Sequence, residues 1–65
     1  KFIRNTIKKH NNFIEHEVLV NIIMKKYGFK NRIVNKMLTY MVDNEIINDI
    51  FWENNVDLRY FINEE

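Results

Sequence analysis

A single glycine, Gly28, separates two stretches of this chain in which apolar residues recur at the spacing of an α-helix. Because glycine adopts a positive φ without steric cost, it predicts the end of a helix that covers residues 15–27. Carboxylates lie in the first turn of that helix and lysines in its last turn, the arrangement that the helix dipole favours. We therefore expect two helices joined by a short turn at residues 28–30.

The helix after this turn has the most regular apolar stripe in the chain. We expect Asn31 to cap its start and Asn44 to take the left-handed position at its end. A shorter helix is expected at the beginning of the chain, where Asn11 and Asn12 end it. The residues expected to face the core are Phe2, Ile3, Thr6, Ile7 and His10 in the first helix, Leu19, Ile22, Ile23 and Tyr27 in the second, and Val34, Met37, Leu38, Met41 and Val42 in the third.

Two β-rich runs follow, at residues 46–53 and 56–62. Between them, Asn54 and Asn55 both tolerate the positive φ of a two-residue hairpin loop. Such a loop fixes the register of the two strands. One face then pairs Glu53 with Val56, Phe51 with Leu58, Asp49 with Tyr60 and Ile47 with Ile62, and the other pairs Trp52 with Asp57, Ile50 with Arg59 and Asn48 with Phe61.

Helix, helix, turn, helix and hairpin, in this order, predict an α+β fold of the winged-helix type, with a three-helix helix-turn-helix core and a C-terminal β-hairpin as the wing. Only one face of the hairpin can lie on the helices. The wing surface, formed by Ile50, Trp52 and Phe61, is therefore expected to stay partly exposed. Phe13 and Ile14 make too short a run for more than a bridging strand or a hydrophobic hinge.

The length of 65 residues leaves room for one domain, 1–65, which buries only about 60% of the surface that its unfolded chain exposes. A deep catalytic cavity is therefore not expected. The absence of Cys excludes a disulfide framework and a thiolate metal site. The longest apolar runs, such as Ile22–Met24, are far shorter than the roughly 20 residues that span a bilayer, so no membrane contact is expected. From the start on Lys1 rather than Met, we expect a domain cut from a longer chain.

Charge is divided sharply along the sequence. Residues 1–36 carry nine Lys or Arg and two Glu, a balance of 9 − 2 = +7. Residues 37–65 carry one Arg and seven Asp or Glu, a balance of 1 − 7 = −6, so the total is only +1. Such an asymmetry indicates contact with a charged partner and directs the first half of the chain toward an anionic surface.

The sequence contains no recognisable catalytic or metal-binding constellation. His10 and His16 are separated by the predicted helix break, and no acidic residue stands at a ligand spacing from them. We expect His10 to be partly buried at a helix end and His16 to cap a helix or form a hydrogen bond. Asp49, Glu53 and Asp57 lack a nearby phosphate loop or nucleophile and are expected to form a solvated acidic face. We therefore expect a non-catalytic module without cofactor, metal or small-molecule substrate.

The basic half of the chain is compatible with duplex DNA as a partner. In a DNA-binding winged helix the third helix enters the major groove. The acidic wing opposes this interpretation, because each carboxylate weakens the phosphate contacts that dominate affinity. An ordinary solvated helix face, or a winged helix that binds protein through its apolar wing surface, would also account for the pattern. The residues expected to contact DNA are Lys30, Asn31, Arg32, Asn35, Lys36 and Thr39.

A series of short motifs runs along nearly the whole chain. They are Ile7, Lys8 and Lys9; Ile14, His16, Leu19 and Val20; Phe29 and Lys30; Val34–Leu38; Asp43–Asp49; and Leu58–Phe61. In order and spacing, these motifs resemble the C-terminal winged-helix or neddylation domain of cullins, the scaffolds of multi-subunit ubiquitin ligases. The chain departs from the family at residues 5–8, where cullins have Val-Arg-Ile-Met, and at Asn31, where they have Pro. An unrelated winged helix, such as the C-terminal domain of an archaeal replicative helicase, shares the helix-turn-helix pattern.

The resemblance implies a role for Lys9, which precedes His16 by seven positions, as the modified lysine of the family precedes its own His. It implies that Lys9 accepts the C-terminal glycine of a ubiquitin-like modifier in an isopeptide bond, with Lys8 as second choice. It also implies a RING-finger subunit and the conjugating machinery of the modifier as partners. The chain would then be the C-terminal module of an intracellular protein of the cytoplasm or nucleus.

Overall fold

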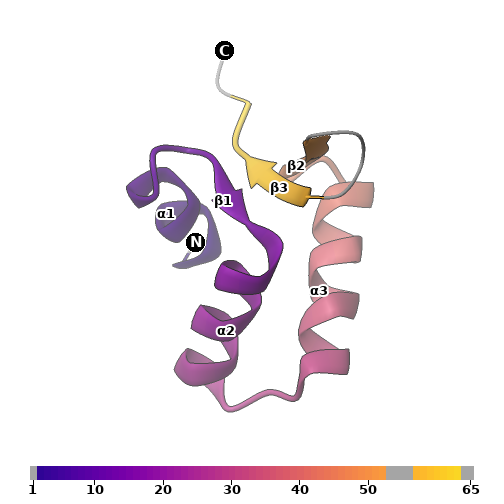
Figure 1. Cartoon of the computed structure of the whole chain (residues 1–65). Helices are drawn as coiled ribbons and strands as arrows, with labels where there is room; N and C mark the ends of the chain where they lie inside the picture. The colour runs from indigo at the N-terminus through magenta and orange to yellow at the C-terminus, as the bar shows by residue number, and fades with distance from the viewer. Residues whose placement is uncertain (1, 53–56, 64–65) are drawn as a thin grey trace.

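The computed structural model describes residues 2–52 and 57–63, apart from the side chain of Trp52. The strands form one antiparallel sheet, in the order β1-β3-β2, above the helices (Figure 1). The chain is thus a small α+β protein whose layout is compatible with a winged helix. Its elements are α1 (Phe2–Lys9), β1 (Ile14–Glu15), α2 (His16–Tyr27), α3 (Asn31–Asp43), β2 (Asn48–Trp52) and β3 (Asp57–Phe61).

Residues with positive φ end α1 and α2 where the sequence predicts. Asn11 and Asn12 follow α1 with φ values of 62° and 56°, and Gly28 follows α2 with a φ of 74°. The N–H of Gly28 donates to the carbonyl of Met24 at 2.8 Å, the single bond of a left-handed helix cap. A Cβ added at Gly28 would meet no atom within 4 Å. The positive φ, and not a lack of space, therefore explains the glycine.

The end of α3 differs from the prediction by one residue. Asn44 has a φ of −98°, and the left-handed residue is Glu45, with a φ of 60°. The N–H of Ile46 donates to the carbonyl of Met41 at 2.8 Å, the long bond of a Schellman motif. The helical ladder reaches one residue further than predicted, because the N–H of Asn44 still donates to the carbonyl of Tyr40.

The start of α3 also corrects the prediction. Asn31 is the first helical residue, and the preceding Lys30, which is extended with a φ of −80° and a ψ of 157°, is the cap residue. The carbonyl of Lys30 accepts the N–H of Val34 at 3.1 Å, but its side chain forms no cap hydrogen bond. The Asn31 side chain instead accepts a hydrogen bond from Asn35 at 2.6 Å, which draws it along the helix rather than back over its end.

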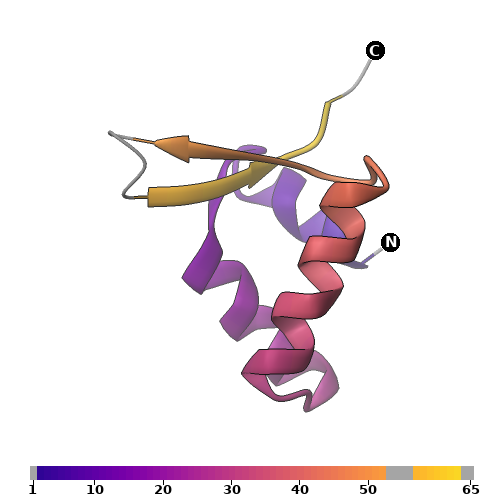
Figure 2. The ribbon, with the colours of Figure 1, turned by 90° about the vertical axis from the view of Figure 1, so that its right-hand side faces the viewer.

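The core lies between the helices and the lower face of the sheet, which crosses the upper ends of α2 and α3 (Figures 1 and 2). Most residues expected to face the core are buried or half-buried, but His10 and Tyr27 are exposed. Both follow the last buried residue of their helix, where the chain turns away from the core. The buried hydrophobic residues are Ile3, Ile7, Ile14, Leu19, Val20, Ile23, Val34, Leu38, Ile47, Tyr60 and Ile62.

The register of the β2–β3 hairpin is confirmed from Asn48 opposite Phe61 to Trp52 opposite Asp57. The predicted loop at 54–55 and the pair formed by residues 53 and 56 lie outside the described residues. Of the two alternatives expected at Phe13 and Ile14, the structure has the bridging strand, one residue later: β1 pairs Ile14 with Tyr60 and Glu15 with Arg59. Glu15 therefore belongs to this strand and not to the helix, which begins at His16. Pairing on both sides makes β3 the central strand.

Asn12 extends the link between β1 and β3 with its side chain. Its amide nitrogen donates to the carbonyl of Ile62 at 2.9 Å, and its amide oxygen accepts the N–H of Ile62 at 2.7 Å. Ile62 is buried, so both of its backbone groups need partners within the protein. The side chain of Asn12 therefore acts as a clamp, because it replaces a missing strand and fixes the end of α1 against the end of β3.

We predict that Asn12→Gly destabilises the protein by about 1 to 3 kcal/mol, because it leaves the two Ile62 groups unsatisfied. Glycine keeps the positive φ, so only the side chain is tested. The matched control is Asn11→Gly, since Asn11 also has a positive φ but is exposed. The measurement is the free energy of unfolding in urea, and equal effects of the two substitutions would contradict the clamp.

Candidate interaction surfaces

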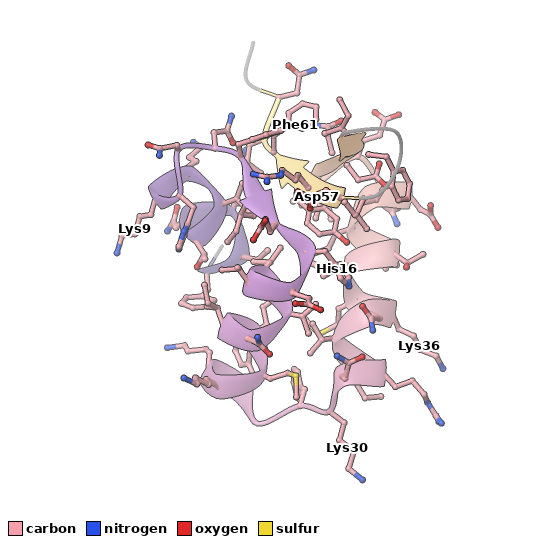
Figure 3. The ribbon with its side chains drawn as sticks, viewed as in Figure 1. Lys9, His16, Lys30, Lys36, Asp57 and Phe61 are labelled. Atoms are coloured by element: carbon pink, nitrogen blue, oxygen red, sulfur yellow. The ribbon has the colours of Figure 1, made fainter. Side chains whose placement is uncertain are left out.

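Lys9 is the last residue of α1, and its exposed side chain points away from the rest of the molecule (Figure 3). The chain reverses directly after it, through Asn11 and Asn12, so that Lys9 occupies a corner. Lys8, the second choice, is also exposed. In the cullin resemblance, Lys9 is identified by its distance of seven positions from His16. His16 lies between α2 and α3, so the structure does not bring these two side chains together.

The residues predicted to contact DNA separate into two groups on α3. Arg32 and Lys36 are four positions apart and both exposed. Figure 3 shows Lys36 pointing outward from α3 and Lys30 extending from its start. Asn35 and Thr39 instead border a hollow between α3, α2 and the sheet. The remaining predicted residue is the exposed Asn31, whose side chain is bound to that of Asn35.

The exposed side of α3 is partly apolar. Ile33 is 43% exposed and Tyr40 is 63% exposed, and their separation of seven positions places them on the same side of the helix. Lys36 lies between them along the helix. A surface that mixes large apolar side chains with a few cations resembles a protein interface more than a surface that contacts phosphates.

The hollow between α2, α3 and the sheet has a volume of about 230 Å³. In it, the hydroxyl of Tyr60 and Nδ1 of His16 are hydrogen-bonded at 2.8 Å. The expected hydrogen-bonding role of His16 is thus confirmed, but its partner was not predicted, because the two residues are 44 positions apart. Burial, assisted by the nearby Asp49 carboxylate, raises the pKa of Tyr60 from 10.0 to about 12.

The outer face of the sheet contains the predicted wing surface. Ile50 is exposed and Phe61 is half-buried, as expected, and the side chain of Trp52 lies outside the described residues. The unexpected feature here is Arg59, whose guanidinium lies 5.1 Å from the ring centre of Phe13. The pairing of β1 with β3 creates this contact, which a local pattern could not reveal.

Arg59 also changes the predicted role of the acidic residues. Its Nη2 donates to Asp57 at 2.7 Å and to Glu15 at 3.2 Å. Asp57 is therefore part of an ion pair rather than of a purely solvated acidic face. Asp49 is exposed as expected, and residue 53 lies outside the described part of the chain.

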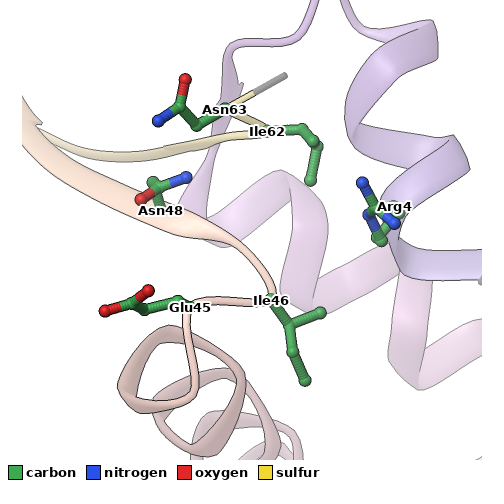
Figure 4. A pocket seen from close by; sticks show the side chains of 6 residues that line it. All are labelled: Arg4, Glu45, Ile46, Asn48, Ile62 and Asn63. Carbon is green, nitrogen blue, oxygen red and sulfur yellow. The ribbon is translucent and has the colours of Figure 1, made fainter. Parts of the chain in front are cut away.

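Another hollow, of about 370 Å³, lies between α1 and the start of β2 (Figure 4). Among the described residues that border it, the charged ones are Arg4 and Glu45, and none carries a hydroxyl, thiol or amine. Across residues 2–52 and 57–63, no group of three or more His, Cys, Asp or Glu is arranged to hold a metal ion. Within the same ranges, no helix combines the length and the apolar character needed to cross a membrane.

Comparisons with models of protein families, with curated proteins and with solved structures return no match to this chain. Function is therefore inferred from the surfaces described above. These are the exposed corner at Lys9, the mixed apolar and basic side of α3, and the outer face of the sheet.

The raised pKa of Tyr60 predicts a loss of stability at high pH. The pKa is about 12 in the folded protein and 10.0 when unperturbed, so the folded state holds the proton more tightly. The proton on Tyr60 therefore contributes to the free energy of unfolding in full below pH 10.0, and this contribution is lost as the pH rises through about 12. The full contribution is roughly 1 to 3 kcal/mol. In the Tyr60→Phe variant, the decrease in the free energy of unfolding that Tyr60 causes at alkaline pH should be absent. The measurement is urea unfolding at about pH 9 and about pH 11.5.

The control for this experiment is Tyr40→Phe, which alters a tyrosine that is 63% exposed. It should leave the alkaline dependence of wild-type stability unchanged. An alkaline loss of equal size in wild type and in Tyr60→Phe would show that Tyr60 is not its source.

Proposed function

We propose that this chain is a winged-helix module of a cullin-like ubiquitin-ligase scaffold, and that Lys9 is the acceptor for a ubiquitin-like modifier. The observation that supports this role is the position of Lys9, exposed at a corner where α1 ends. In conjugation, the amine must approach the thioester carbonyl of a charged carrier to roughly 3 to 3.5 Å. A lysine that projects from a corner can enter the site of a partner enzyme without rearrangement of the domain.

The fold presents this lysine on a firmly held element. Ile3 and Ile7 bury the inner side of α1, and the clamp at Asn12 fixes the chain directly after it. A rigid element places a reacting group more precisely than a loop does. The domain therefore only presents the acceptor lysine, whereas the conjugating enzyme supplies the base and the positioning that activate the amine.

The apolar side chains on α3 favour a protein partner for the same module. Ile33 and Tyr40 expose large apolar surfaces, which a solvated helix face does not need. The RING-finger subunit and the conjugating machinery are the partners that the proposal requires. Contact along α3 would leave the corner at Lys9 accessible, because the two lie at separate places on the surface (Figure 3).

We predict that Lys9→Arg abolishes conjugation and leaves the thermal unfolding midpoint nearly unchanged. Arginine keeps the charge and the aliphatic stem but removes the nucleophilic amine. The assay combines the full-length protein, its RING-finger subunit and the conjugating enzymes, and detects the modified chain by its mass. Lys8→Arg is the matched control and should be modified as the wild type is.

Two results of this assay would change the proposal. Modification that persists in Lys9→Arg but disappears in Lys8→Arg would move the acceptor by one residue. Modification that persists in the double variant would refute an acceptor on α1.

The second candidate function is binding of duplex DNA through α3. The observation that favours it is the distribution of charge: residues 18–42 contain five Lys or Arg and no carboxylate. Arg32 and Lys36 lie where a recognition helix would meet phosphates or base edges. Against it, the exposed Asp49 of the adjacent hairpin would repel the backbone of the duplex.

Under this second function, changing Arg32 and Lys36 together to Ala should weaken DNA binding and reduce the salt slope by about 0.9 for each lost phosphate contact. The measurement is fluorescence anisotropy of a labelled duplex at several salt concentrations. The control removes the same charge from α1, as Lys8→Ala with Lys9→Ala. No binding by the wild type at micromolar concentration and low salt would exclude this function.

A further inference from the structure

Two ends of this protein carry opposite charges. The α2–α3 turn and the β2–β3 hairpin lie at opposite ends of the molecule (Figures 1 and 2). We call the first the turn end, defined by Met24, Lys25, Tyr27, Phe29 and Lys30. We call the second the hairpin end, defined by Asp43, Asp49, Phe51 and Leu58.

The turn end combines positive charge with exposed aromatic rings. Tyr27 and Phe29 stack on each other, with ring centres 5.4 Å apart, and are 44% and 40% exposed. Beside them, Met24, Lys25 and Phe29 border an open hollow of about 460 Å³. Gly28 adds no side chain to this hollow, and no carboxylate occurs anywhere in residues 18–42.

The hairpin end has the opposite charge and is also apolar. Asp43 and Asp49 border the 230 Å³ hollow together with Leu58. Phe51 follows Asp49 on the same face of β2, because side chains alternate along a strand, and it is 54% exposed. The nearby Arg59 does not cancel these carboxylates, since it is paired with Asp57 and Glu15 on the outer face.

We propose that the hairpin end of one copy of this chain binds the turn end of a second copy. The carboxylates of Asp43 and Asp49 would face Lys25 and Lys30, and the ring of Phe51 would cover the hollow beside Phe29. The two ends carry opposite charges, and each exposes an aromatic ring that can pack against the other. The charge complementarity identifies a second copy as the occupant, because a copy of this chain carries both surfaces.

The contact joins different surfaces of the two copies. Such a head-to-tail interface leaves one free turn end and one free hairpin end on every dimer, so association continues into longer chains unless a ring closes. Its electrostatic part should weaken with salt, since the screening length falls from roughly 30 Å at 0.01 M to about 3 Å at 1 M. Low salt should therefore promote assembly and high salt should reverse it.

The test is sedimentation velocity of the whole chain, with two neutralising variants. The turn variant, Lys25→Gln with Lys30→Gln, removes the cations of one end. The hairpin variant, Asp43→Asn with Asp49→Asn, removes the carboxylates of the other. All four side chains are exposed, and circular dichroism with thermal unfolding verifies that each variant is folded.

At low salt the mass of the wild type should rise with concentration beyond that of a dimer. Each variant alone should associate roughly tenfold more weakly. An equimolar mixture should recover association but stop at a one-to-one dimer, because only one intact hairpin end and one intact turn end remain to meet. A wild type that stays monomeric at millimolar concentration and low salt would overturn the proposal, as would association that mixing the variants does not restore.

Discussion

The pairing of β1 with β3 is the interaction on which the rest of the structure depends. β1 has only two residues, yet it joins the segment between α1 and α2 to the central strand of the sheet. The clamp from Asn12 to Ile62 continues the same connection beyond the end of the strand. Without it, α1 would have only its own short apolar side to hold it, and β3 would lose one of its two neighbours. The same connection fixes the segment between Lys9 and His16 against the sheet.

Features with a local cause could be predicted from the sequence. The apolar stripe of α3, the helix end at Gly28 and the register of the hairpin each depend on residues that are close together in the chain, and each is confirmed. The boundaries expected at Asn31 and Asn44 differ from the structure by one residue, because α3 already includes Asn31 and its hydrogen bonds extend through Asn44. Contacts across the whole chain, such as the bond between His16 and Tyr60, have no local signal and were missed.

The candidate surfaces were likewise predictable only in part from the sequence. Exposure of the basic residues on α3 follows from helical periodicity and is confirmed, whereas the acidic face was only partly correct. Asp57 is paired with Arg59 on the same strand, and Arg59 also binds Glu15 of the neighbouring strand. The structure therefore separates exposed carboxylates from paired ones, which the count of charges in the sequence cannot do. In the described part of the chain, the exposed Asp43 and Asp49 border the hollow beneath the hairpin.

The topology of the sheet has a consequence for the integrity of the chain. Gly28 and the turn that follows divide the molecule into a segment with α1, β1 and α2 and a segment with α3, β2 and β3. A cut of the backbone at this turn would remove none of the described strand pairs and neither bond of the Asn12 clamp, because none of them involves residues 28–30. The two fragments would share a buried apolar interface and an antiparallel strand pair. A chain cut at this turn would thus retain the contacts by which its two fragments recognise each other and reassemble.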